Sequence, residues 1–184
     1  MKKRVVITGM GVVSPLGNEI DKFWNNLVAG TNGVTTQDWL VEEGYNATVA
    51  ATVKDDLHID DVVDFKEARR MDPFTRYSVH SAKTAIEQSG LDTSNEDPSR
   101  MGVIIGSGVG GLYTFEEQHA MLIKRGHPRV SPFFIPMMIP DIAAGYVSII
   151  WGLKGPNFSV NSACATAAHA IGLGMRAIRY GDAD

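Results

Sequence analysis

The sequence has a single cysteine, Cys164, among its 184 residues. An intramolecular disulfide is therefore excluded, and with it the cross-linked framework of small secreted domains. Lys plus Arg number 17 against 21 Asp plus Glu, a net charge of −4, so the chain lacks the positive excess typical of nucleic-acid binding. It also lacks a run of about 18 apolar residues, the length that spans a membrane. We expect a cytoplasmic protein that binds neither nucleic acid nor membrane.

Motifs for metal ions and nucleotides are also missing. No pair of histidines has H-x-x-x-H spacing, so we expect no metal site. The glycine cluster at 9–14 ends in serine followed by proline, which does not suit a phosphate-binding helix start. Residues 106–111 fit G-x-G-x-x-G, but no acidic residue follows about 20 positions later to hold a ribose. We expect no metal or organic cofactor.

Hydrophobic residues make up 44% of the chain and charged residues 21%, as in globular proteins. Short apolar runs next to glycine predict buried strands, and apolar residues at helical spacing predict helices. The strands are expected at 5–8, 102–106 and 158–161, with a weaker one at 47–53 in an irregular segment. The helices are expected after an Asn18 cap and at 73–89, 112–124, 142–150 and 165–180. Strands alternating with helices indicate an α/β fold with a mostly parallel sheet.

Two further features are a stretch with four prolines and a last predicted helix that no strand follows. Four prolines between Pro128 and Pro140 exclude a continuous helix or central strand there. The helix at 165–180 has no return strand after it, so we expect the chain to be part of a longer polypeptide.

Cys164 lies where the strand at 158–161 turns into the helix at 165–180. Unpaired amides and the dipole at a helix N-terminus favour a thiolate and can stabilise an oxyanion. His169 is five residues further on, roughly 140° around the helix, so it points away and a base must come from elsewhere. A free cysteine is also often buried in a core. Position alone leaves the nucleophile and the core cysteine open.

Three segments carry a family resemblance: RVVITGMGVVSPLG at 4–17, GSGVGG at 106–111 and GPNFSVNSAC at 155–164. In order and spacing they resemble the β-ketoacyl-[acyl carrier protein] synthases, most closely the elongating condensing enzymes of type II fatty acid synthesis. The resemblance implies a thiolase-like fold, with a duplicated α-β-α-β-α architecture and a mixed, mostly parallel sheet. Residues 1–184 would form its N-terminal half, and the C-terminal half would lie beyond Asp184.

The resemblance also implies a chemistry. Cys164 would be the nucleophile that holds an acyl chain as a thioester, with its own backbone amide in the oxyanion hole. Malonyl-acyl carrier protein would lose carbon dioxide, and the resulting carbanion would attack the acyl group. The family's two catalytic histidines and its lysine lie in the second half. We therefore expect the 184-residue chain alone to be inactive in condensation.

Other roles follow from the resemblance. Val109 would lie beside the acyl chain, where the family usually has isoleucine. Phe133 and Phe134 would line the acyl pocket or the interface of a homodimer, with ordinary core residues as the alternative. The carrier protein would bind a basic patch, for which a solvated charged face is the alternative; the patch comprises Lys66, Arg69, Arg70 and Arg129.

Two other functions stay open. A ketosynthase of polyketide synthesis shares the cysteine motif. A non-catalytic fragment that binds the carrier protein or dimerises would explain the missing histidines and lysine.

Overall fold

The computed structural model describes residues 3–53, 57 and 59–184. Its strands are β1 (Thr35–Thr36), β2 (Val49–Ala50), β3 (Val103–Gly106) and β4 (Asn157–Val160). Its α-helices are α1 (Ile20–Val28), α2 (Asp38–Glu42), α3 (Phe65–Ala68), α4 (Pro73–Ser89), α5 (Leu112–Arg125), α6 (Phe134–Met138), α7 (Ile142–Trp151) and α8 (Thr166–Tyr180). Short 3-10 turns are η1 (Pro98–Arg100), η2 (His127–Arg129) and η3 (Ala163–Ala165).

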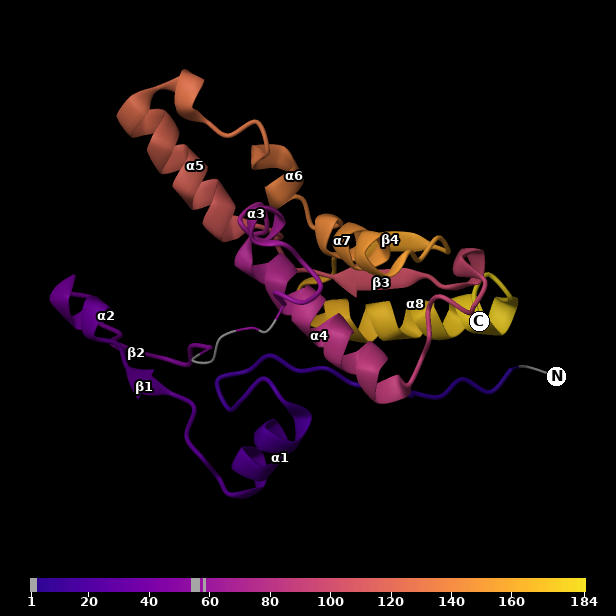
Figure 1. Ribbon diagram of the computed structural model, residues 1–184. Coiled ribbons are helices and arrows are strands. Elements are labelled where there is room, and N and C mark those ends of the chain that lie inside the picture. The colour runs from indigo at the N-terminus through magenta and orange to yellow at the C-terminus, as the bar shows by residue number, and fades with distance from the viewer. Residues whose placement is uncertain (1–2, 54–56, 58) are drawn as a thin grey trace.

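The centre of the molecule is the parallel pair β3 and β4. Val103 lies opposite Asn157, and Gly106 lies opposite Val160. Helix α7 packs on one side of this pair and α8 on the other, while α4 packs against α7 (Figure 1). The chain leaves β3 through α5, α6 and α7 before it returns as β4, which is the crossover that parallel strands require. The predicted alternation of strands and helices around a parallel sheet is confirmed here.

The hydrophobic core lies between α4, α7 and β3. Val79 of α4, Val103 of β3 and Val147 of α7 are buried in it. The remaining buried members are Ile59, Val63, Met71, Ala144 and Leu153. Val103 is the first residue of β3 and Ile105 packs against the core, so this core holds β3 against the rest of the fold.

The predicted strand at 5–8 is wrong. The segment forms no strand among the described residues, and Val6 and Ile7 are 63% and 75% exposed. A strand needs a neighbour to accept and donate its ladder hydrogen bonds, whereas this segment runs on into a contact with α4. There a Cβ on Gly9 would overlap the backbone of Ala85, and one on Gly11 would overlap that of Ser81.

Two other predicted borders differ from the structure. Helix α1 begins after Glu19, because the carboxamide of Asn18 accepts from the N–H of Ser14 instead of capping the helix. Of the predicted strand at 47–53, only β2 forms, in antiparallel pairing with β1. The longer predicted helices match α4, α5, α7 and α8 within a residue at each end, and the proline-rich stretch holds only the short α6 and η2.

A buried carboxylate joins two helix ends. Asp72 is 3% exposed; its Oδ1 accepts from the N–H of Phe74, at 3.2 Å, at the start of α4. Its Oδ2 accepts from the N–H of Thr114, at 2.8 Å, in the first turn of α5. One side chain thus satisfies an unpaired N–H at each of two helix N-termini. This contact fixes the end of the glycine-rich turn, which leads directly into α5.

The two ends of the described chain lie on the same side of the fold (Figure 1). Nζ of Lys3 is 2.8 Å from Oδ1 of Asp184, and Nε of Arg100 donates to Oδ2 at 2.9 Å. The hydrogen bond from Arg100, followed by that from Lys3, holds the pKa of Asp184 well below its usual range. In the described part of the chain no helix has the length and apolar character needed to cross a bilayer.

Candidate active site

Cys164 is exposed on η3, between β4 and the first residue of α8. We call residues 162–166 the cysteine turn. Its position at a strand-to-helix junction is as predicted, and its side chain is exposed in the described chain. The preceding residue, Ala163, has φ +48°, the only positive φ of a non-glycine residue in the described ranges. Such a conformation costs about 1–3 kcal/mol and persists only where the neighbouring structure holds it.

Ser162 makes the hydrogen bonds that hold this turn. Its N–H donates to Oγ1 of Thr166, at 2.9 Å, and its carbonyl accepts from the N–H of Ala165, at 3.0 Å. Its hydroxyl lies 2.7 Å from Nδ1 of His169. His169 thus bonds Ser162, as its predicted direction away from Cys164 allows. Neither the thiol nor the backbone N–H of Cys164 makes a hydrogen bond within the described chain, so both can meet a bound substrate.

Two contacts connect the cysteine turn and the residue before it to the C-terminal end of β3 and the glycine-rich turn. The Nδ2 group of Asn161 donates to the carbonyl of Gly108, at 2.8 Å. A Cβ on Gly106 would overlap Cγ2 of Thr166 and lie 2.9 Å from the carbonyl oxygen of Val160. Glycine at 106 therefore allows β3, β4 and the start of α8 to approach closely. These contacts bring the glycine-rich turn beside the cysteine turn.

The glycine-rich turn, residues 107–111, presents Val109 to solvent. Val109 is 67% exposed, and the turn is closed by the N–H of Gly110, which donates to Oγ of Ser107 at 2.9 Å. Gly110 has φ +82°, which favours glycine, and a Cβ there would overlap the carbonyl of Met138. The structure thus places Val109 on a rigid loop next to the residues that precede Cys164.

Phe133 and Phe134 lie at the start of α6 and face different partners. The ring of Phe134 is 6.2 Å from that of Phe115 on α5. The ring of Phe133 lies 4.0 Å below the guanidinium carbon of Arg70, in cation–π geometry. The structure therefore joins a residue predicted for the acyl pocket to one predicted for the basic patch. It places neither phenylalanine in a described contact with Cys164.

The basic residues gather in part. Lys66 lies on α3, Arg69 caps its end, with its guanidinium 5.8 Å from the ring of Phe65, and Arg70 follows. Arg129 is exposed on η2, which follows the distal end of α5 (Figure 1). Three of the four predicted residues therefore lie together around α3, and the fourth lies on a separate element.

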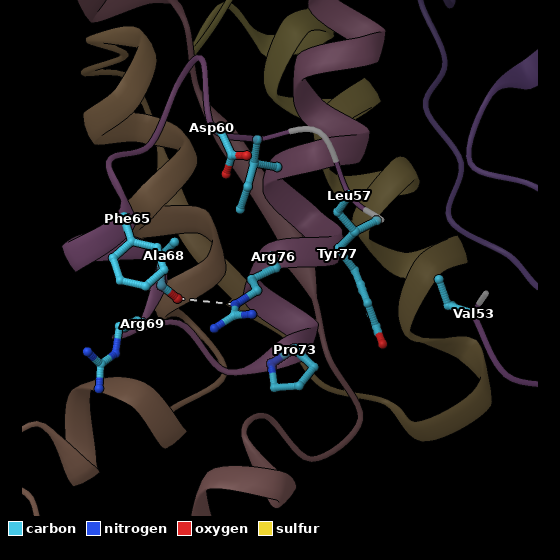
Figure 2. Close-up of a pocket in the computed structure, with 10 residues that line it drawn as sticks. Val53, Leu57, Asp60, Phe65, Ala68, Arg69, Pro73, Arg76 and Tyr77 are labelled. Carbon is cyan, nitrogen blue, oxygen red and sulfur yellow. Dashed lines mark hydrogen bonds between the residues drawn. The ribbon is translucent and has the colours of Figure 1, made fainter. Parts of the chain in front are cut away.

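Two cavities flank these features. One, of about 670 Å³, lies between α3 and the start of α4, and the Nε–H of Arg76 donates there to the carbonyl of Ala68, at 3.1 Å (Figure 2). Arg69 also lines it, but Cys164 does not. The other, a groove of about 760 Å³, runs along α4, β3 and the first turns of α8, and Gly106 and Ala167 line the end next to the cysteine turn. Cys164 does not line the second groove either, although Ala167, three residues further along the chain, does.

The described histidines have other partners or positions. Nε2 of His80 lies 3.0 Å from the carbonyl oxygen of Asn18, and His119 stacks on Phe115. His127 lies on η2, and His58 falls outside the described residues. Among the residues that the structure describes, no three His, Cys, Asp or Glu side chains gather in a way that could hold a metal ion.

Sequence reasoning found Cys164 but not the side chains that hold it. The bonds of Ser162 to His169 and of Asn161 to Gly108 join residues 7 and 53 positions apart. Neither bond follows from helical spacing, because Ser162 precedes α8 and Gly108 lies on another turn.

Comparisons with known proteins agree with this geometry. Residues 2–184 match the family described as "Beta-ketoacyl synthase, N-terminal domain". A "3-oxoacyl-[acyl-carrier-protein] synthase 2" from Staphylococcus aureus (strain N315) is 47% identical over 182 residues. This alignment covers 99% of the present chain and 44% of the relative, so the chain spans less than half the length of this relative.

Solved structures give the same result. A β-ketoacyl synthase from Burkholderia phymatum STM815 superposes with a TM-score of 0.83 at 31% identity, over 100% of this chain and 45% of that one. A ketosynthase of a type II polyketide synthase, solved in complex with its acyl-carrier protein, superposes with a TM-score of 0.85 at 25% identity, over 100% and 50% of the chains. The predicted thiolase-like α/β fold is confirmed. The chain belongs to the β-ketoacyl synthase family, in which it corresponds to the N-terminal domain.

Proposed function

We propose that this chain is the N-terminal half of an elongating β-ketoacyl-[acyl carrier protein] synthase of type II fatty acid synthesis, in which Cys164 accepts the acyl chain. The observation that carries the proposal is the exposed Cys164 on a held turn at the start of α8. The 47% identity to a 3-oxoacyl-[acyl-carrier-protein] synthase 2 supports the reaction class. The decarboxylating histidines and lysine would come from the half of the protein beyond Asp184.

The first step is a thioester exchange at Cys164. A bond forms between Sγ and the acyl carbon while the bond from that carbon to the carrier thiol breaks, and the proton of Cys164 ends on the departing thiol. Negative charge develops on the acyl oxygen, and the N–H of Cys164 stabilises it. Holding the acyl group covalently divides a difficult condensation into two easier steps.

The acyl chain would lie beside Val109. This residue lies on the turn that Asn161 attaches to the cysteine turn, which supports a role in chain-length preference. Phe133 and Phe134 would border the same pocket or a homodimer interface.

The carrier protein would dock on Lys66, Arg69 and Arg70 around α3, with Arg129 on η2 as a separate contact. A net charge of −4 makes such a local basic patch necessary for an acidic partner. The polyketide ketosynthase solved with its acyl-carrier protein supports this class of partner. We further propose a cytoplasmic homodimer that works without a metal ion or organic cofactor.

The test is transfer of an acyl group in the full-length protein. Incubation with an acyl-carrier-protein thioester should add one acyl mass to the peptide that contains Cys164, and Cys164→Ala should abolish it. As a matched control, Ser94→Ala changes an exposed serine in the loop between α4 and η1 and should leave acylation at Cys164. Acylation that persists at another residue in Cys164→Ala would refute the assignment of the nucleophile.

The fragment hypothesis needs a second measurement. The denatured mass of the protein from its native source should be about twice 19.9 kDa if a second half is present, since the chain covers 44% of its relative. A mass near 19.9 kDa, together with no decarboxylation of malonyl-carrier protein, would favour a non-catalytic binding or dimerisation fragment.

The polyketide alternative predicts a different substrate preference. A polyketide ketosynthase would elongate β-keto intermediates in preference to saturated acyl chains.

A further inference from the structure

We propose that Ser162 and His169 form a positioning pair that holds Cys164 in the orientation that acyl transfer requires. The inference rests on the proposed function of Cys164 as acyl acceptor. Ser162 lies two residues before the nucleophile, and His169 is the fourth residue of α8. The hydroxyl of Ser162 and Nδ1 of His169 lie 2.7 Å apart and are paired with each other.

The pair supplies the bond that ties the start of the cysteine turn to the body of α8. The N–H and the carbonyl of Ser162 bond to Thr166 and Ala165, which are themselves part of the turn or its first helical residue. Only the hydroxyl reaches further, to Nδ1 of His169 at 2.7 Å. This bond therefore anchors the turn as a unit to the helix.

Ala163 is the residue that needs this anchor. It lies between Ser162 and Cys164 with φ +48°, outside the conformations that alanine prefers. Without the hydroxyl bond Ser162 keeps only its two bonds within the turn, and rotation at Ala163 towards an ordinary conformation would turn Cys164 with it. The direction of Sγ relative to the N–H of Cys164 would then change, and this N–H is the proposed donor to the acyl oxygen.

His169 is substituted to remove its hydrogen bond to Ser162. Its side chain is exposed in the described chain. A neutral imidazole can accept from the Ser162 hydroxyl at Nδ1 or donate to it, and the carboxamide of asparagine offers an acceptor or donor at a similar distance from the backbone. Leucine offers neither.

The experiment compares two reactions of the same thiol in the full-length protein. Acyl transfer from an acyl-carrier-protein thioester needs the oxyanion donor, whereas alkylation by iodoacetamide displaces iodide and does not. Both products are followed on the peptide that contains Cys164 by mass spectrometry. We expect His169→Leu and Ser162→Ala to slow acyl transfer about tenfold and to change alkylation by less than about twofold. His169→Asn should recover acyl transfer to within about threefold of the parent rate.

A matched control is His119→Leu on α5, which removes an exposed imidazole that stacks on Phe115 and is remote in sequence from the turn. Both rates should stay at the parent values. The proposal is overturned if His169→Leu acylates at the parent rate, or if asparagine and leucine behave alike. It is also overturned if acylation and alkylation fall together, because that result would mean a general loss of structure.

A further measurement separates this inference from the proposed function. If the parent protein alkylates at Cys164 but accepts no acyl group, the proposed function fails and the pair is tested by amide hydrogen exchange. The N–H groups of Ala165 and Thr166, which bond to the carbonyls of Ser162 and Ala163, should then exchange at least about threefold faster in His169→Leu and recover in His169→Asn. Unchanged exchange would overturn the positioning role.

Discussion

Asp72→Ala should destabilise the protein more than loss of a surface cap, because its carboxylate serves two helices. The substitution removes the cap of α4, which is worth about 1 kcal/mol. It also leaves the N–H of Thr114 without an acceptor, and Thr114 is 1% exposed. An unsatisfied buried donor costs about 1–3 kcal/mol. We therefore expect the free energy of unfolding to fall by about 2–4 kcal/mol.

Urea unfolding of parent and variants, followed by circular dichroism, would measure this change. Asp64→Ala is the matched control, since Asp64 caps α3 by accepting from the N–H of Glu67 at 2.8 Å but is exposed. Water can replace that carboxylate, so the loss should stay at or below about 1 kcal/mol. Equal losses for Asp72→Ala and Asp64→Ala would refute the argument that burial and the second helix decide the magnitude.

Two further predictions concern the borders of the site and the fold. Gly106→Ala should lower stability by about 1–3 kcal/mol in urea unfolding, because the new Cβ would overlap Thr166; an unchanged midpoint would show that α8 can move away freely. Arg100→Ala should raise the pKa of Asp184 in an NMR titration, since hydrogen bonds from Arg100 lower it. Because the pKa of Asp184 is lower in the folded than in the unfolded protein, its ionised form stabilises the fold at pH values above the unfolded pKa, about 3.9. The stability difference between parent and Arg100→Ala should therefore be fully present above about pH 4 and shrink as the pH falls through the folded pKa; a pH-independent difference would contradict this.

Local patterns were sufficient for the long elements. The Asp72–Pro73 start and the Gly90 end delimit α4, and both signals act within a few residues. The strand β3 was recognisable because a parallel strand buried between helices is apolar along its length. The segment at 5–8 has the same composition, yet forms no strand among the described residues, because composition does not supply a pairing partner.

The candidate site was predictable only in its chemistry. Cys164 stood out because it is the single cysteine and lies between a strand and a helix. The position of Arg70 over Phe133 was not foreseeable, since it joins α3 to the start of α6 across 63 residues. It was also not foreseeable that Arg129 lies on η2, whereas Lys66, Arg69 and Arg70 lie around α3.

The sequence by itself determined the family, the order of strands and helices from β3 onward, and the identity of the nucleophile candidate, because each follows from short segments and their order along the chain. Only the tertiary structure decided how the cysteine turn is held. The bond from Asn161 to Gly108, the close approach of Gly106 to Thr166 and the two bonds of Asp72 all join separate elements. Such contacts depend on how the packed core places β3, α4, α5 and α8 in space, and no local periodicity encodes those distances.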